Sequence, residues 1–305
     1  MTDRFIKKIV LVTAMLLAAA AFGCYRQAPQ PTVELKTRSF TDDLGRKVQI
    51  PEKIDRVISL APNLTEIIFA VGGGSKLVGV TTFCNYPPET QAIQKVSDTL
   101  TPNIESIVAL QPQVVFVSTA SQLQTFTKIL NEQEITVFVT APNSLDDIYK
   151  SITTVGEILG TGDRAADLVQ EMRGRVMLVS HSVSYQPLGK ARPKVFVQID
   201  KNALYTIGKD SFITDIIARA GGISATADIA TAYPKLSKET ALALNPDVII
   251  LSESDDNREP NEIFRNSPAV KTGRVFRVNA DLLSRPGPRI VDALELIAEK
   301  LGQIK

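Results

Sequence analysis

A sixteen-residue stretch in the first half of the chain recurs in the second half, which limits the folds that the chain can adopt. Residues 103–118 (NIESIVALQPQVVFVS) align without a gap on residues 237–252 (SKETALALNPDVIILS), 134 positions later. Each copy predicts a helix capped by Asn103 or Ser237, a turn at proline, and a buried strand that ends in serine. The chain is therefore expected to fold as two similar lobes.

Short runs of β-branched and other apolar residues accompany both copies. They lie at residues 57–60, 77–80, 114–117, 136–139, 195–199, 248–251 and 275–278. Because the runs are apolar on both faces and alternate with helical patterns, they indicate parallel strands that helices cover on both sides. We expect an α/β fold in which each lobe has a mainly parallel sheet flanked by helices.

A long amphipathic helix is predicted between the two sets of strands, from Asp163 to Val183. Five apolar residues recur there at intervals of three and four: Val169, Met172, Val176, Val179 and Val183. Such a helix can be a rigid strut between two lobes, or one more helix covering the sheet of a single domain. The expected boundaries are an N-terminal lobe at 41–160, a linking helix at 161–188 and a C-terminal lobe at 189–305.

The N-terminus has the pattern of an export signal. An apolar run from Ile9 to Phe22 follows basic residues and is too short to cross a bilayer, which takes ~20 residues. Small residues then lead to Cys24, which resembles the cleavage site of bacterial lipoproteins, although Phe22 departs from that pattern. We expect a signal peptide at 1–23 and a disordered tether at 24–40, lipidated on Cys24. An ordinary cleavage site with a chance cysteine is the alternative.

Composition narrows the classes of function. The net charge of +1 gives no field that would recruit nucleic acid or an anionic membrane. The chain has a single histidine, which is too few for a zinc site. The sequence also shows no evident acid or nucleophile for this histidine, which argues against acid–base catalysis. If Cys24 is lipidated, Cys84 is the one remaining thiol, so no disulfide is expected. These features weigh against an enzyme and against a bound metal cofactor. We separately expect the protein to be a monomer with no cofactor of its own.

Glu105 and Glu239 fall at the second position of the two repeated helices. A carboxylate there faces the positive end of the helix dipole and contributes ~0.3–1 kcal/mol, which is a sufficient explanation by itself. Two matching carboxylates related by a pseudo-twofold axis can also bind basic residues of a symmetric partner. The sequence leaves both explanations open.

Several motifs occur in order along the chain after the signal peptide: Arg56–Glu66, Phe83–Pro87, Asn103–Glu105, Gly208–Gly222, Tyr233–Glu239 and Arg285–Ile290. Together they resemble the periplasmic binding proteins of cobalamin and ferric-siderophore ABC importers. The resemblance implies two α/β lobes joined by one long helix, with the ligand held between them. It also implies a homodimeric permease with ATPase subunits as partner, whose arginines would receive Glu105 and Glu239.

The ligand pattern nearest to this sequence is that of cobalamin-binding members. The resemblance implies four ligand-binding residues: Phe83, Tyr233, Asp281 and Arg285. Thr99 departs from the pattern, because it stands where a cleft tryptophan would be expected. A corrinoid is a broad, mostly apolar disc with amide edges, which suits aromatic walls and a few polar groups. An anionic ferric siderophore would instead favour Arg285 and Arg289.

The same residues also have structural explanations. Phe83 and Tyr233 can be core residues, and Asp281 and Arg285 can form an ion pair of the scaffold. Cys84 can be an inert small side chain rather than a thiolate ligand of cobalt or iron.

We therefore expect a lipoprotein in the periplasm or otherwise outside the cytoplasm, anchored to a bacterial membrane. It captures a corrinoid, cobalamin or cobinamide, which is a cobalt chelate. The alternatives are a ferric-siderophore or haem binding protein of the same importer class, and a structural or signalling lipoprotein without a transport role.

Overall fold

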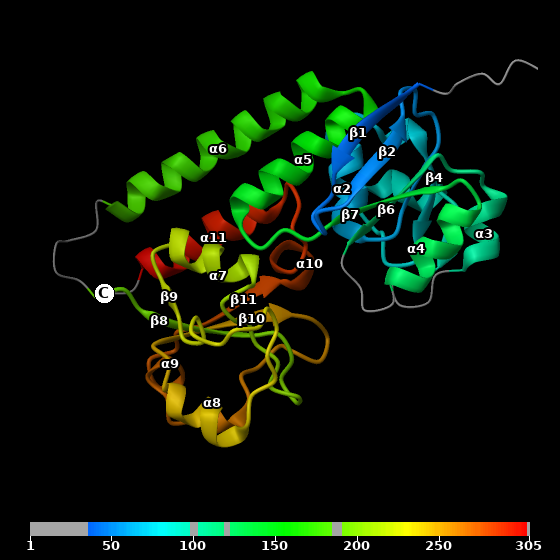
Figure 1. Ribbon diagram of the computed structural model, residues 1–305. Coiled ribbons are helices and arrows are strands. Elements are labelled where there is room, and N and C mark those ends of the chain that lie inside the picture. Colours follow the sequence, from blue (N-terminus) through cyan, green and yellow to red (C-terminus); the bar gives the residue numbers. More distant parts are fainter. Residues whose placement is uncertain (1–35, 98–102, 119–122, 185–190, 304–305) are drawn as a thin grey trace, which may run out of the picture. The chain divides into compact units, whose positions relative to one another are not determined.

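Parallel strands form two separate sheets in the computed structural model, which describes residues 36–97, 103–118, 123–184 and 191–303 (Figure 1). The predictions on the signal peptide, on Cys24, on most of the tether and on Thr99 lie outside the described residues.

The first sheet has the strand order β5-β4-β3-β6-β7, and all its neighbours pair in parallel. Its strands are β3 (Val57–Ser59), β4 (Leu77–Thr81), β5 (Lys95–Ser97), β6 (Val114–Ser118) and β7 (Thr136–Thr140). Along β6, Val114 and Phe116 belong to one hydrophobic cluster, and Val115 and Val117 to another. Helices α2 (Pro62–Ala70) and α5 (Leu145–Leu159) cover the first face, and α3 (Ile104–Ala109) and α4 (Leu123–Glu132) the second.

The second sheet has the strand order β11-β10-β8-β9, again with parallel neighbours. Its strands are β8 (Lys194–Gln198), β9 (Ile223–Ser224), β10 (Val248–Glu253) and β11 (Val275–Asn279). Helices α7 (Phe212–Arg219) and α11 (Ile290–Gly302) cover one face, and α8 (Lys238–Leu244) and α9 (Pro268–Lys271) the other. The shorter elements are η1 (Gly74–Lys76), η2 (Pro88–Ala92), η3 (Glu262–Phe264) and α10 (Ala280–Leu283).

The long helix α6 (Gly162–Ser184) connects the two lobes and matches the predicted helix to within one residue at each end. Its apolar face, which includes Met172 and Val176, is buried where the helix packs against α5 and α11 (Figure 1). One hydrophobic cluster runs from Leu64 in α2 through this face to Leu294 in α11, and Thr37–Lys305 form one compact unit. The helix is thus both a connection and a cover of the shared core.

An antiparallel ribbon of β1 (Thr37–Thr41) and β2 (Lys47–Pro51) precedes the first sheet. Strand β1 thus lies before Thr41, the residue at which the sequence suggested that the N-terminal lobe begins. β1 was missed because it has no apolar run. Its backbone is held by pairing with β2, and Arg38 donates hydrogen bonds to the carbonyls of Glu157 and Ile158 at 2.7 and 2.8 Å.

The two repeated segments have the same local structure. Asn103 Oδ1 accepts a hydrogen bond from the backbone N–H of Ser106 at 2.9 Å, and Ser237 Oγ accepts one from Thr240 at 3.1 Å. The residue before each proline is left-handed, with φ of 46° at Gln111 and 43° at Asn245. These observations confirm the predicted α/β class with two similar lobes.

Candidate functional site

Loops at the carboxyl ends of the parallel strands carry three of the four predicted ligand residues. Phe83 follows β4, and Asp281 and Arg285 follow β11. The strand order reverses between β3 and β6 in the first sheet, and between β8 and β10 in the second. Open α/β sheets bind ligands outside the carboxyl ends of their strands, near such reversals. The topology therefore places these loops where a ligand site is expected.

A polar network joins the two lobes at these loops. Arg285 donates to Glu66 Oε1 at 2.9 Å and to Asn85 Oδ1 at 2.8 Å. It also pairs with Asp281 at 2.6 Å, and Asn85 donates to Asp281 at 3.0 Å. The ion pair of Asp281 with Arg285 thus exists, as the structural explanation of these residues requires, and Asn85 connects it to the segment that carries Phe83.

Glu66 is the buried centre of this network, with 2% of its side chain exposed. Arg289 donates to both of its carboxylate oxygens, at 2.8 and 2.6 Å, and lies over the ring of Tyr86 at 3.9 Å from the centroid. The hydrogen bond to Glu66 raises the pKa of Arg289. Arg289 is therefore already paired inside the protein, which the sequence could not show.

Two predicted aromatic residues lie at the surface, so the prediction that they could be core residues is wrong. Phe83 is 55% exposed and Tyr233 is 45% exposed. The hydroxyl of Tyr233 hydrogen-bonds with the buried Ser211, and desolvation raises the pKa of this phenol. Tyr233 does not belong to the network around Arg285, whereas the exposed Tyr86 touches it and was not singled out from the sequence.

Cys84 is buried although it lies between Phe83 and Asn85. Its sulfur lies 3.1 Å from the Thr65 hydroxyl and 3.2 Å from the Thr81 hydroxyl. The thiol is therefore directed into the first lobe, as the inert explanation requires.

A cavity of about 530 Å³ adjoins the network in the second lobe. It is lined by Glu253, Ser254, Asp255, Arg258, Asn279, Ala280 and Asp281. Because Asp281 belongs to both the cavity and the network, this is the candidate ligand cavity.

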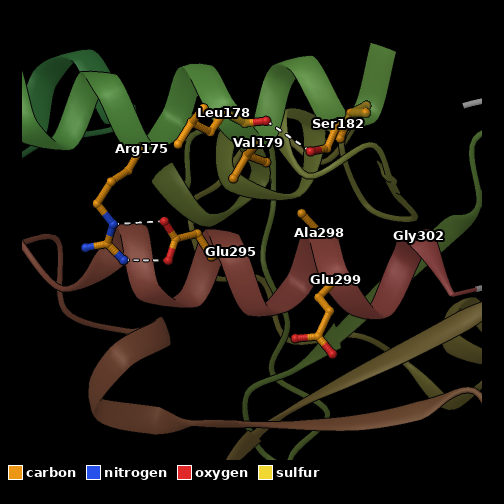
Figure 2. Close-up of a pocket in the computed structure, with 9 residues that line it drawn as sticks. Arg175, Leu178, Val179, Ser182, Glu295, Ala298, Glu299 and Gly302 are labelled. Atoms are coloured by element: carbon orange, nitrogen blue, oxygen red, sulfur yellow. Dashed lines mark hydrogen bonds and ion pairs between the residues drawn. The ribbon is translucent and has the colours of Figure 1, made fainter. Parts of the chain in front are cut away.

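Another cavity, of about 420 Å³, lies between α6 and α11. Figure 2 shows Arg175 of α6 facing Glu295 of α11 at one end, with Leu178 and Ala298 further along. None of the predicted ligand residues lines it.

The two predicted docking residues are exposed in the first turns of their helices, Glu105 in α3 and Glu239 in α8. The Glu239 carboxylate hydrogen-bonds with its own backbone N–H and with Ser237, which lowers its pKa. This first-turn arrangement fits the dipole explanation and leaves both carboxylates accessible to a partner.

Within the described ranges, no group of three or more His, Cys, Asp and Glu residues is placed to hold a metal ion. No helix in that part of the chain has the length and hydropathy to span a bilayer.

Two α/β lobes joined by a polar network, with exposed aromatic rings after β4, form an arrangement typical of proteins that bind small molecules. The chain belongs to the periplasmic binding protein family, whose sequence profile matches residues 57–282.

Three similar proteins show where in this family the chain lies. A Bacillus subtilis protein described as an uncharacterized ABC transporter substrate-binding lipoprotein, YvrC, is 31% identical over 97% of both chains. The crystal structure of the vitamin B12 binding protein BtuF of Vibrio cholerae matches with 26% identity and a TM-score of 0.70, covering 83% of this chain and 99% of that one. The haem-binding protein RhuT of Roseiflexus sp. RS-1 matches with 25% identity and a TM-score of 0.71, covering 81% and 98%.

The resemblance drawn from the motifs is therefore confirmed. The chain is a binding protein of the ABC importer class, and this class implies a small-molecule ligand and a permease with its ATPase as partners. Its relatives are transport proteins that bind substrates, not enzymes.

Proposed function

We propose that this protein captures a corrinoid, cobalamin or cobinamide, at the junction of its lobes and delivers it to a homodimeric ABC permease. The observation that carries the proposal is the exposed ring of Phe83 two residues from Asn85, which hydrogen-bonds with Asp281 and Arg285 of the other lobe. An apolar face beside paired polar groups suits a disc with amide edges.

Tyr233 is the second aromatic residue in this proposal. Tyr233 is 45% exposed, so it can contact an apolar ligand at the surface. The two remaining ligand residues, Asp281 and Arg285, are charged and would orient the ligand by hydrogen bonds to its amide edges.

A ferric siderophore or haem is the alternative ligand, and the likeness to a haem-binding protein favours it. Such ligands carry carboxylates or other anionic groups, which bind best to free guanidinium groups. Arg285 and Arg289 are both paired with Glu66, which weighs against this alternative.

Delivery would use Glu105 and Glu239 as docking carboxylates for basic residues of the two permease subunits. Cys24 would carry the lipid that anchors the protein outside the cytoplasm, as the description of the Bacillus relative as a lipoprotein supports. A structural or signalling lipoprotein without a ligand is the remaining alternative.

Calorimetric titration with cyanocobalamin, dicyanocobinamide and haemin tests the ligand. We expect saturable one-to-one binding of a corrinoid, and roughly tenfold weaker binding by Phe83→Ala, since a stacked aromatic contact contributes ~1 kcal/mol or more. Leu178→Ala, on the exposed face of α6, is the matched control and should bind like the wild type. Saturable binding of haemin alone would favour the alternative ligand, and binding of none would favour a protein without a transport role.

A further inference from the structure

Among the residues that the structure describes, Glu66 is a buried carboxylate that pairs with two arginines of the other lobe. We propose that Glu66 sets the charge of the ligand site, so that the protein selects chelates with uncharged amide edges over chelates with carboxylate edges. The inference rests on the proposed function, because it requires the ligand to lie beside the network between the lobes.

The burial of Glu66 fixes the state of the two arginines. Its side chain is 2% exposed, while those of Arg285 and Arg289 are 11% and 22% exposed. A buried carboxylate without a cation is strongly unfavourable, so Glu66 retains both guanidinium groups. Glu66 and Asp281 together balance the charges of Arg285 and Arg289, so the network has no net positive charge to offer a ligand.

The carboxylates around the site outnumber its cations. Within the network, Glu66 and Asp281 face two guanidinium groups. The adjoining cavity adds Glu253, Asp255 and one further cation, Arg258, which is paired with Asp255 at 2.9 Å. Four carboxylates therefore stand against three guanidinium groups, and a ligand carboxylate would meet a net negative site.

An amide edge meets no such repulsion. Its N–H groups can donate to Asp281 or Glu253, and its carbonyl can accept from Arg285, which has more than one donor. The discrimination thus depends on the negative charge of Glu66 even though Glu66 itself is too buried to touch the ligand. Glu66 is a positioning residue that acts through Arg285 and Arg289.

Two corrin probes with the same ring separate the two kinds of edge. Dicyanocobinamide has amide side chains, and the cyanide complex of cobyrinic acid has carboxylates in their place. The quantity to measure by calorimetry is the dissociation constant of the carboxylate form divided by that of dicyanocobinamide. In the wild type we expect the carboxylate form to bind far more weakly. Glu66→Gln should lower the ratio roughly tenfold, because it frees about one positive charge within several ångströms of the ligand.

Neutralising an arginine, alone and together with Glu66, distinguishes this role from simple support of the fold. Arg289→Gln should raise the ratio, and Glu66→Gln combined with Arg289→Gln should return it toward the wild-type value. The control is Glu295→Gln, which removes the same charge from a carboxylate paired with Arg175 outside the candidate cavity (Figure 2). It should leave the ratio unchanged.

An unchanged ratio in folded Glu66→Gln, with wild-type binding of dicyanocobinamide, would overturn the inference and leave the proposed function standing. If the wild type binds neither corrin, the proposed function itself fails, and the inference with it. Should Glu66→Gln not fold, Arg289→Gln carries the test, because it leaves Glu66 paired with Arg285; a ratio that does not rise would then refute the inference.

Discussion

The helices α3 and α8 hold equivalent places in the two lobes, yet they are anchored differently. α3 buries Ile107 completely, and its Val108 packs against the hydrophobic cluster that contains Val115 and Val117 of β6. At the matching positions, α8 buries only Ala241 and leaves Leu242 58% exposed. Both helices nevertheless have a side-chain N-cap, a left-handed residue after the helix and a proline turn.

This difference shows which parts of the repeat are independent of packing. Backbone signals, the first-turn glutamate and the leucine at Leu110 and Leu244 recur, whereas the anchoring side chain at Ile107 is replaced by Ala241. Glu105 and Glu239 therefore do not match as a by-product of two identical cores. The helix dipole and the proposed docking on a shared partner both account for this match, and transport measurements distinguish them.

Removal of the two glutamates should have the largest effect. Glu105→Ala combined with Glu239→Ala should reduce transport in vesicles reconstituted with the permease roughly tenfold or more, since each lost charge pair costs ~1 kcal/mol or more at an interface. Ligand affinity should remain within about twofold, because neither residue belongs to the network around Glu66. Each single variant should have a similar, smaller effect if the two lobes dock equivalently.

The matched controls are Glu132→Ala at the end of α4 and Glu262→Ala in η3, both exposed carboxylates of the same lobes. They should transport like the wild type. Normal transport by the double variant would show that the helix dipole alone accounts for the two glutamates.

The anchoring of α3 and α8 should differ in stability. Ile107→Ala should lower the free energy of unfolding by ~2–5 kcal/mol, because it empties a fully buried site. Ala241→Gly, at the equivalent place in α8, should lower it by only about 1 kcal/mol, mainly through helix propensity. Urea denaturation at neutral pH measures both, and equal losses would contradict the contrast between the helices.

The left-handed residues should give the smallest difference. Gln111→Gly should stabilise the protein by about 0.5–1 kcal/mol, because glycine adopts positive φ without steric cost. Asn245→Gly should change stability by less than about 0.5 kcal/mol, since asparagine already tolerates this conformation. Thermal unfolding of the two variants compares them, and a loss of stability in Gln111→Gly would refute the expectation.

The central strands could be predicted because their side chains are apolar on both faces. In β6, Val114 and Val115 enter different clusters, so the pattern in the sequence is the pattern of burial. β1, β2, β5 and β9 were not predicted, because the first three have no continuous apolar run and β9 has two residues.

The site was predictable only where its partners are close in the chain. Asp281 and Arg285 are four residues apart, a spacing at which side chains can meet. Glu66 lies 219 residues before Arg285, and no local pattern indicates that they touch. Its position inside a recognisable motif was a signal, but its role became visible only with the folded neighbours.

Arg38 holds the start of the folded chain in two ways. Its strand pairs with β2, while its side chain holds the last carbonyls of α5. If the protein hangs from a lipid on Cys24, any pull along the tether reaches the first lobe here. The force would then act both on the hydrogen bonds between β1 and β2 and on the bonds from Arg38 to the end of α5. We therefore expect β1 to stay paired with β2 while the protein moves on its anchor.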